Sequence, residues 1–281
     1  MARIVYVNDI YVPEEEAKIS IFDRGFLFAD GVYEVTAVLD RKLVEFEEHI
    51  SRLKRSLTEL DMEMIKSKDE FLEIHRELVN RNNLTEGAIY LQVTRGIADR
   101  DFAFPEDVPQ SLILFTQEKS LTSVKPGIRV ISVPDIRWGR RDIKTVQLLA
   151  PSMAKMMAVR EGKDDSWMVE DGYVTEGTSN NAYIVTKESK IITRNLSNSI
   201  LHGITRASVL RLASELGMEI EERPFTIAEA QEATEAFITS ATTFVCPVIE
   251  IDGLAISTGK SGPVANRLNE VYIEESRKAA I

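Results

Sequence analysis

The apolar spacing of this 281-residue chain changes period at Glu47. Before that point, apolar and polar residues alternate, and the runs Arg3–Val7 and Ile10–Val12 flank a polar turn, which predicts a β-hairpin. After it, apolar residues recur at intervals of three and four, the spacing of an amphipathic helix. These residues are Ile50, Leu53, Leu57 and Leu60. Because hairpins, helices and strands then follow one another without strict β-α-β alternation, the pattern favours an α+β fold over a doubly wound parallel sheet.

The rest of the chain continues this mixture. Further strands are predicted at Val32–Leu39, Ala88–Thr94, Leu112–Thr116, Ile128–Val133, Ser166–Glu170, Ala182–Val185, Lys190–Thr193, Glu235–Thr239 and Phe244–Ile249. Further helices are predicted after Asp69, just after Gly203 and after Gly262–Pro263. Met153, Met156 and Met157 lie at helical spacing and are expected to fill the core. The polar run Glu176–Asn181 is expected to be a turn between strands.

The length favours two domains, since domains mostly run to about 100–150 residues. The polar segment Gln117–Gly127 has the composition of a linker. We therefore predict a small N-terminal domain over residues 1–117, a linker over 118–126 and a larger C-terminal domain over 127–281.

The totals exclude several classes of function. No window approaches the roughly 18 consecutive apolar residues of a membrane-spanning helix, and acids stand where a signal peptide has its apolar core, so we expect a cytoplasmic protein with no membrane partner. A net charge of −11 with interleaved signs argues against nucleic-acid binding. Cys246 is the single cysteine, which excludes an intrachain disulfide. The three histidines are scattered, so no metal site is expected.

The stretch Asp135–Pro151 contains the first candidate for chemistry, Lys144. Three arginines precede this lysine and apolar residues follow it: Arg137, Arg140 and Arg141, then Val146, Leu148 and Leu149. Neighbouring positive charge and burial both disfavour an ammonium ion, so the pattern is compatible with a neutral, nucleophilic amine. The alternative is that the arginines are solvated and Lys144 begins a helix.

Three other segments offer groups for an anionic ligand. Gly203 precedes a helix with Thr205 as a candidate cap, and a helix N-terminus attracts anions. The hydroxyl-rich turn Thr239–Thr243 could complete the anion site, and Glu176 could hold a protonated ring nitrogen. Each has an ordinary alternative, namely a plain helix start, a plain turn and a solvated carboxylate. Pyridoxal 5′-phosphate (PLP) requires a lysine, a carboxylate and an anion seat together.

Eight segments resemble fold-type IV PLP-dependent aminotransferases, most of all the D-amino-acid aminotransferase branch. They are DRGFLFADGVYEV, EEHISRLKRSL, QVTRG, DIRWGRRDIKTVQLL, VTEGTSNNAYIV, LHGITR, AFITSA and PVIEIDG. The resemblance runs in the same order from the first strand to about Gly253. It implies the two-domain architecture of that family, with an active site at the domain and dimer interface of a homodimer.

The resemblance also implies roles for individual residues. Lys144 matches the lysine that forms the Schiff base, and Glu176 matches the acid that pairs with the pyridine nitrogen. The other positions that match cofactor-binding residues are Arg52, Arg137, Leu201, Gly203, Ile204, Thr205, Ser240, Ala241 and Thr242. Tyr33 and Arg100 match residues that trap the substrate carboxylate, with Arg100 reaching in from the neighbouring subunit.

Two positions depart from the family pattern. Phe102 replaces a histidine of the carboxylate trap, and Ala241 replaces a phosphate-binding threonine, for which Thr242 or a backbone N–H could compensate. Losing the histidine donor could relax the demand for a carboxylate and admit amines such as (R)-1-phenylethylamine.

The resemblance therefore implies transamination between D-amino acids and a 2-oxo acid such as 2-oxoglutarate or pyruvate. Alternatives with the same fold are an (R)-selective amine transaminase, a branched-chain aminotransferase and an aminodeoxychorismate lyase. The alternative outside enzymes is an anion-binding module.

Overall fold

The computed structural model describes residues 2–123 and 126–281. Contacts within the chain divide it into two compact units. Unit 1 comprises Met1–Leu121, Ile143–Gln147 and Ser276–Ile281, and unit 2 comprises Thr122–Asp142 and Leu148–Glu275. The domain boundaries predicted from the sequence stay a prediction, and residue 1 and residues 124–125 of the predicted linker lie outside the described residues.

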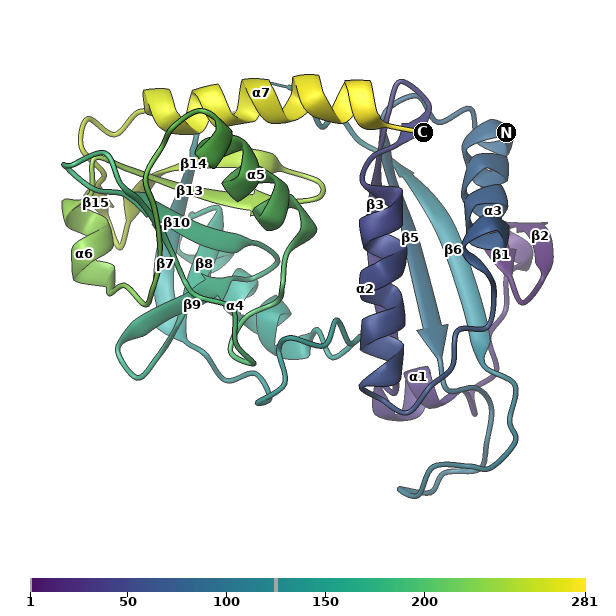
Figure 1. Cartoon of the computed structure of the whole chain (residues 1–281). Helices are drawn as coiled ribbons and strands as arrows, with labels where there is room; N and C mark the ends of the chain where they lie inside the picture. The colour runs from purple at the N-terminus through teal and green to yellow at the C-terminus, as the bar shows by residue number, and fades with distance from the viewer. Residues whose placement is uncertain (1, 124–125) are drawn as a thin grey trace. The chain divides into compact units, whose positions relative to one another are not determined.

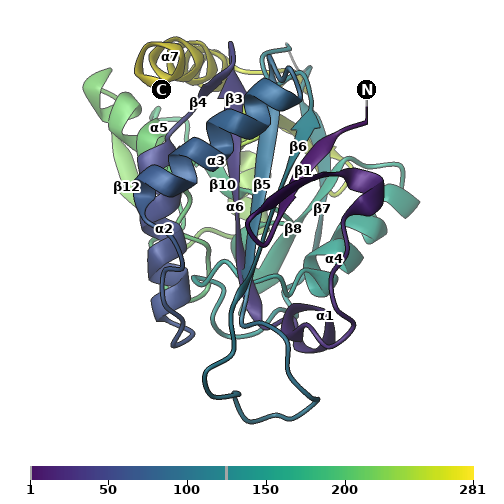
Figure 2. The ribbon, with the colours of Figure 1, turned by 90° about the vertical axis from the view of Figure 1, so that its right-hand side faces the viewer.

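Unit 1 is built on an antiparallel six-stranded sheet with the order β2-β1-β6-β5-β3-β4. Its strands are β1 (Ile4–Val7), β2 (Ile10–Pro13), β3 (Gly31–Leu39), β4 (Lys42–Leu43), β5 (Gly87–Thr94) and β6 (Ser111–Glu118). Helices α2 (Phe46–Thr58) and α3 (Lys68–Arg81) cover one face of this sheet (Figure 2). Their apolar residues form the core of the unit with those of the strands, because each helix has one apolar stripe to bury.

Two short elements complete unit 1. A 3₁₀ turn, η1, spans Glu14–Glu16, and a one-turn helix, α1, spans Arg24–Phe28. The Asp23 carboxylate caps α1 by accepting the Gly25 N–H at 2.8 Å. Apolar spacing does not predict this helix, because five residues are too few to show helical periodicity.

Unit 2 is built on a mixed nine-stranded sheet with the order β12-β11-β10-β13-β14-β7-β8-β9, and β15 pairs with β14 (Figure 1). Its strands are β7 (Ile128–Pro134), β8 (Asp165–Glu170), β9 (Tyr173–Gly177), β10 (Asn181–Val185), β11 (Ile191–Thr193), β12 (Ile220–Glu222), β13 (Glu235–Ser240), β14 (Phe244–Ile251) and β15 (Leu254–Ala255). Its helices are α4 (Leu149–Arg160), α5 (Ile204–Glu215), α6 (Ile227–Glu232) and most of α7 (Pro263–Ala279). Parallel pairs join β7 to β8 and to β14, and the other pairs are antiparallel except β11 with β12.

Two expectations about unit 2 were wrong. Glu176 lies inside strand β9 and not in a turn, and its residue is only 4% exposed. The three methionines of α4 are exposed by 43–53% and do not fill the core. The buried face of α4 consists instead of small residues, Pro151, Ala154 and Ala158, which let the helix lie close to β7 and β8.

Within residues 2–123 and 126–281, no helix has both the length and the low polarity required to cross a membrane.

Candidate active site

Lys144 lies in a short segment of unit 1 that runs beside the start of β3. Its carbonyl oxygen accepts the Tyr33 N–H at 3.0 Å, and its own N–H donates to Ser56 Oγ at 3.3 Å. The Val146 N–H also donates to the Gly31 carbonyl at 3.1 Å. The backbone of this lysine is therefore fixed on both sides, and its half-buried side chain extends from a rigid base.

The Lys144 ammonium lies over the aromatic ring of Tyr33. Its Nζ is 4.1 Å from the ring centre, a cation–π distance. Tyr33 in turn stacks on Tyr90 at 5.5 Å, and Tyr90 stacks on Phe115 at 4.8 Å. This row of rings crosses β3, β5 and β6 and fixes the orientation of Tyr33 beside the lysine.

Arg52 lies on α2 and makes a two-point ion pair with Glu34 of β3. Its Nε donates to Glu34 Oε1 at 2.8 Å and its Nη2 to Oε2 at 2.7 Å. The Nδ1 atom of His49, also on α2, lies 2.7 Å from the same Oε2 atom. Glu34 and His49 are both about 1% exposed, so Arg52 is held by a buried pair that the sequence analysis missed.

Arg100 and Phe102 lie on the long connection between β5 and β6. Phe102 is 79% exposed, and its ring meets Phe28 edge to face at 5.6 Å. The Arg100 guanidinium carbon lies 5.6 Å from the centres of both rings. The structure thus brings Arg100 and Phe102 together in one exposed part of this loop.

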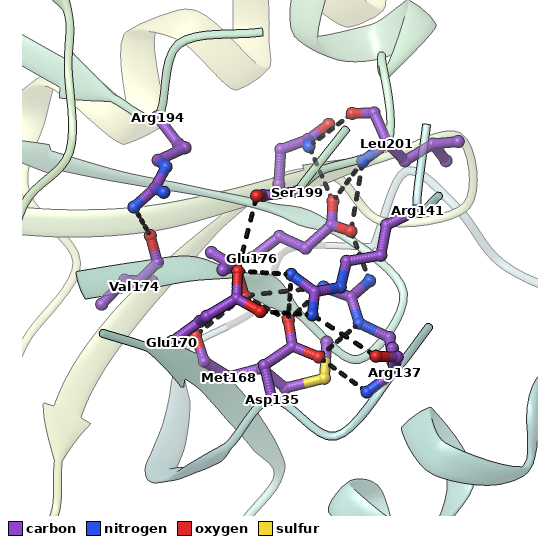
Figure 3. Close-up of polar contacts among 12 residues, drawn as sticks. Asp135, Arg137, Arg141, Met168, Glu170, Val174, Glu176, Arg194, Ser199 and Leu201 are labelled. Carbon is purple, nitrogen blue, oxygen red and sulfur yellow. Dashed lines mark hydrogen bonds and ion pairs between the residues drawn. The ribbon is translucent and has the colours of Figure 1, made fainter. Parts of the chain in front are cut away.

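Glu176 accepts hydrogen bonds from three directions in unit 2 (Figure 3). Arg137 Nη1 donates to its Oε1 at 2.5 Å, and the Leu201 N–H lies 3.1 and 3.2 Å from its two oxygens. Asn181 Nδ2 donates to Oε2 at 3.1 Å and to the Leu201 carbonyl at 3.0 Å. Burial raises the pKa of the Glu176 carboxyl, although the charge and hydrogen bond of Arg137 oppose this rise.

The three arginines before Lys144 are all paired with carboxylates, so they do not form the uncompensated positive cluster that the sequence suggested. Arg137 binds Asp135 as well as Glu176, and Arg140 binds Asp142. Arg141 is not solvated: it is 7% exposed and makes two bonds to Glu170, at 2.8 and 2.7 Å (Figure 3).

Helix α5 begins at Ile204, with Gly203 as its N-cap residue. Among the residues that the structure describes, no side chain caps this end and no acidic residue lies in the first turn, so its backbone N–H groups remain suited to an anion. Thr205 is therefore not the cap. Its Oγ1 lies 3.4 Å from the Tyr272 hydroxyl of α7.

The hydroxyl-rich turn joins β13 to β14, with Ala241 and Thr242 at its tip. Ser240 Oγ and Thr243 Oγ1 lie 2.7 Å apart, and the next residue, Phe244, packs against Tyr272 with ring centres 5.2 Å apart. Because Tyr272 also contacts Thr205, the structure brings the start of α5 and this turn to the same side chain.

The donor groups fit PLP on their chemistry. Unit 2 contains a buried carboxylate of raised pKa and, separately, an uncapped helix start where a Cβ added to Gly203 would lie 2.1 Å from Asn181 Oδ1. Unit 1 contains the half-buried amine and the paired arginine. The predicted residues therefore fall into two groups. Lys144, Tyr33, Arg52, Arg100 and Phe102 are in unit 1, and Glu176, Arg137, Leu201, Gly203, Ile204, Thr205, Ser240, Ala241 and Thr242 are in unit 2.

Comparisons with known proteins agree with this chemistry. Residues 31–251 match the family model of amino-transferase class IV. The chain is 36% identical over 271 residues to D-alanine aminotransferase of Staphylococcus aureus (strain N315), covering 95% of this chain and 96% of that protein. It is 35% identical over 280 residues to D-alanine aminotransferase of Listeria monocytogenes serotype 1/2a (strain 10403S), covering 98% and 96%.

Solved structures give the same result for the fold. A branched-chain amino acid aminotransferase from T.th., complexed with N-(5'-phosphopyridoxyl)-L-glutamate, matches with a TM-score of 0.89 and 28% identity, over 99% of this chain and 95% of that one. The same protein with pyridoxamine 5'-phosphate matches with a TM-score of 0.89 and 29% identity, over 98% and 94%.

Proposed function

Because the chain belongs to the class IV aminotransferase family, whose members are PLP-dependent enzymes, we propose that it transfers the amino group of D-amino acids to a 2-oxo acid. The observation that carries this choice of substrate is the 36% identity to a D-alanine aminotransferase over almost the whole of both chains. The branched-chain enzymes that share the fold are less similar in sequence, at 23–30% identity.

PLP would be held at three points by residues of this chain. Lys144 would bind it covalently, Glu176 would face its ring nitrogen, and Arg52 with the start of α5 would bind its phosphate. Leu201 would lie against its ring, and the turn around Ser240 would add donors for the phosphate. When bound, PLP accepts the electron pair that is left at the substrate Cα.

Lys144 also has the chemistry for the proton transfer. Its amine, once released, would remove the proton from the substrate Cα and later return one, as general base and then general acid. The fixed backbone of the lysine and the ring of Tyr33 limit the positions that this amine can take.

Glu176 would keep the ring nitrogen protonated. A carboxylate in this role must remain charged although it is buried, and Arg137 supplies the opposing charge. The Leu201 and Asn181 donors fix the direction of its two oxygens.

Arg100 and Tyr33 would recognise the substrate carboxylate. We propose that the enzyme is a homodimer in which Arg100 serves the neighbouring subunit, which agrees with the exposure of Arg100 and Phe102 on a single chain. A cytoplasmic location stays a prediction from the sequence.

Phe102 supports a second candidate activity, the transamination of (R)-amines. Its ring, 79% exposed, stands at a position where a hydrogen-bond donor would favour carboxylates, so an apolar substituent could be accepted there.

One titration tests these assignments. The visible absorption of the PLP-loaded protein is followed while D-alanine, L-alanine, L-leucine and (R)-1-phenylethylamine are added separately, and 2-oxoglutarate is then added. We expect D-alanine to bleach the band and 2-oxoglutarate to restore it. Bleaching by L-leucine but not by D-alanine would overturn the proposed substrate class, and bleaching by (R)-1-phenylethylamine would establish the second activity.

A further inference from the structure

Arg24 of α1 is a buried arginine that the sequence analysis did not select. Its residue is 2% exposed, and its Nε donates to Asp30 Oδ2 at 2.7 Å. Arg95 Nε donates to the same oxygen at 2.8 Å. A buried guanidinium requires an opposite charge and acceptors for its remaining N–H groups, and Asp30 meets only the first requirement.

The remaining acceptors of Arg24 lie in the loop between β5 and β6. Its Nη1 donates to the Asp101 carbonyl at 2.7 Å and lies 3.4 Å from the Ala103 carbonyl. These two carbonyl groups stand on either side of Phe102. Figure 2 shows α1 beside the base of this loop, and the bond from Arg24 to the Asp101 carbonyl joins the helix to the loop across 77 residues of sequence.

Aromatic rings complete the contact between Arg24 and the tip. The Arg24 guanidinium carbon lies 4.5 Å from the centre of the Phe28 ring, which meets the Phe102 ring edge to face. Because Arg100 lies over both rings, one packed group contains Arg24, Arg100 and Phe102.

The loop is also held outside residues 100–103: the Ala98 N–H donates to the Phe22 carbonyl at 3.2 Å, and the Arg95 guanidinium carbon lies 3.6 Å from the centre of the Phe104 ring. Phe102 and Phe104 are 79% and 55% exposed, and Arg100 is exposed as well. A loop whose side chains face solvent is mobile unless its backbone is held. The bonds from Arg24 to the carbonyls around Phe102 therefore restrain the part of the loop that presents Arg100.

We propose that Arg24 is a positioning residue for recognition of the substrate carboxylate. It touches neither substrate nor cofactor. It fixes the backbone on both sides of Phe102, and so fixes the direction in which Arg100 and Phe102 extend. This inference rests on the proposed function, in which Arg100 receives the carboxylate.

A purely structural role for Arg24 makes a different prediction. If the residue only balances the charge of Asp30, its replacement lowers stability and affects all substrates alike. If it positions the tip, the loss falls on substrates that have a carboxylate, and it falls on KM more than on kcat.

Arg24→Lys separates these roles, because a lysine can keep the charge beside Asp30 but lacks the planar fork that also reaches the loop. We expect the KM for D-alanine to rise about tenfold, a typical effect of a small misplacement, with kcat changed less than about threefold. The affinity for (R)-1-phenylethylamine, which has no carboxylate, should stay the same, as should the PLP absorption band.

Hydrogen exchange gives a readout that does not depend on activity. Backbone amides of residues 97–110 should exchange faster in Arg24→Lys than in the unchanged protein, whereas those of α2 should not. The matched control is Arg81→Lys. Arg81 makes the same kind of contact, with its guanidinium carbon 4.5 Å from the centre of the Tyr11 ring, but it lies on the surface of α3. This control should alter neither KM nor exchange in the loop.

A second variant covers the case in which Arg24→Lys does not fold. Asp101→Gly makes the loop backbone at this exposed position more flexible and leaves the buried ion pair of Arg24 and Asp30 intact. This variant should therefore also raise the KM for D-alanine and speed amide exchange in the loop. Unchanged KM and unchanged exchange in the folded variants would overturn the inference. If the unchanged protein does not act on D-alanine, the proposed function fails, and exchange in the loop then decides alone whether Arg24 holds the tip.

Discussion

The Glu34 carboxylate of β3 and the Arg52 guanidinium of α2 are joined by two hydrogen bonds, at 2.8 and 2.7 Å, inside unit 1. Burial by itself raises the pKa of Glu34, but the charge and hydrogen bonds of Arg52, helped by His49, lower it to about 2. The ordinary value is 4.5, so the folded protein favours the charged form.

This lowered pKa predicts a loss of stability in acid. The lowered pKa of Glu34 contributes on the order of 3 kcal/mol to the free energy of unfolding. This contribution is fully present above pH 4.5 and is lost as the pH falls toward 2. Glu34→Gln cannot ionise, so it should be less stable than the unchanged protein at pH 7 by about 3 kcal/mol, with a difference that shrinks toward pH 3. Urea unfolding at several pH values measures this difference. Glu73→Gln, on the exposed face of α3, should show no such trend.

His75 of α3 should produce a second, separate pH dependence. Burial lowers its pKa to about 4 from 6.5, although its hydrogen bond with the Phe71 carbonyl opposes the change. Between pH 6.5 and 4, His75 is therefore protonated in the unfolded chain but not in the folded protein. The free energy of unfolding falls by on the order of 3 kcal/mol as the pH drops through this range. His75→Asn should lose this part of the slope. Equal slopes for both proteins between pH 7.5 and 4.5 would contradict the prediction.

Lys144→Ala should abolish the half-reaction but not the binding of PLP. We expect the rate with D-alanine to fall by at least about 100-fold, the usual contribution of a general base, because no other amine extends from this segment of unit 1. Single-turnover absorbance measures the rate, and mass spectrometry after borohydride reduction tests for the covalent bond. Lys54→Ala, an exposed position on α2, serves as the control and should keep full turnover. Normal turnover in Lys144→Ala would contradict the proposed function.

Arg137→Gln should move the pH dependence of the half-reaction. The charge of Arg137 opposes the effect of burial on Glu176, so its removal raises the pKa of this carboxyl further. Fewer molecules then carry the charged carboxylate at a given pH, and the acid limb of the rate profile should move to higher pH. Arg140→Gln, whose guanidinium pairs with Asp142, should leave the profile unchanged. A profile for Arg137→Gln that keeps its acid limb would show that Arg137 does not set the charge of Glu176.

The strands and helices that apolar spacing predicted are present in the structure, because each of them buries at least one face. The hairpin of β1 and β2, the stripe of α2 and the start of α5 after Gly203 follow directly from that rule. The five-residue helix α1 could not be predicted this way, since it is shorter than two turns of the helix period.

The sequence analysis did not predict the buried polar groups of unit 1, although the sequence contains one pattern that indicates them. Alternate residues of β3 form its buried face, namely Val32, Glu34, Thr36 and Val38. His49 and Arg52 lie three residues apart on α2, the helix that covers this face. A charged residue at an inward position of a strand requires a partner, and that partner is found on α2. The methionines of α4 show the opposite error, since helical spacing alone does not tell which face of a helix is buried.

Gly203→Ala should weaken PLP binding by displacing the Asn181 side chain, which does not itself bind PLP. An added Cβ would lie 2.1 Å from Asn181 Oδ1, so Asn181 must move, and its Nδ2 would then lose the bonds to Glu176 and to the Leu201 carbonyl. Both the helix start and the carboxylate are disturbed at once, and we expect the dissociation constant for PLP to rise about tenfold, the effect of losing roughly one hydrogen bond to a charged group. Gly139→Ala is the matched control, because no atom of the described residues lies within 4 Å of its added Cβ. Titration of the two apo variants with PLP, followed by absorbance, measures both constants. Equal constants would mean that the close approach of Gly203 to Asn181 serves only the packing of α5.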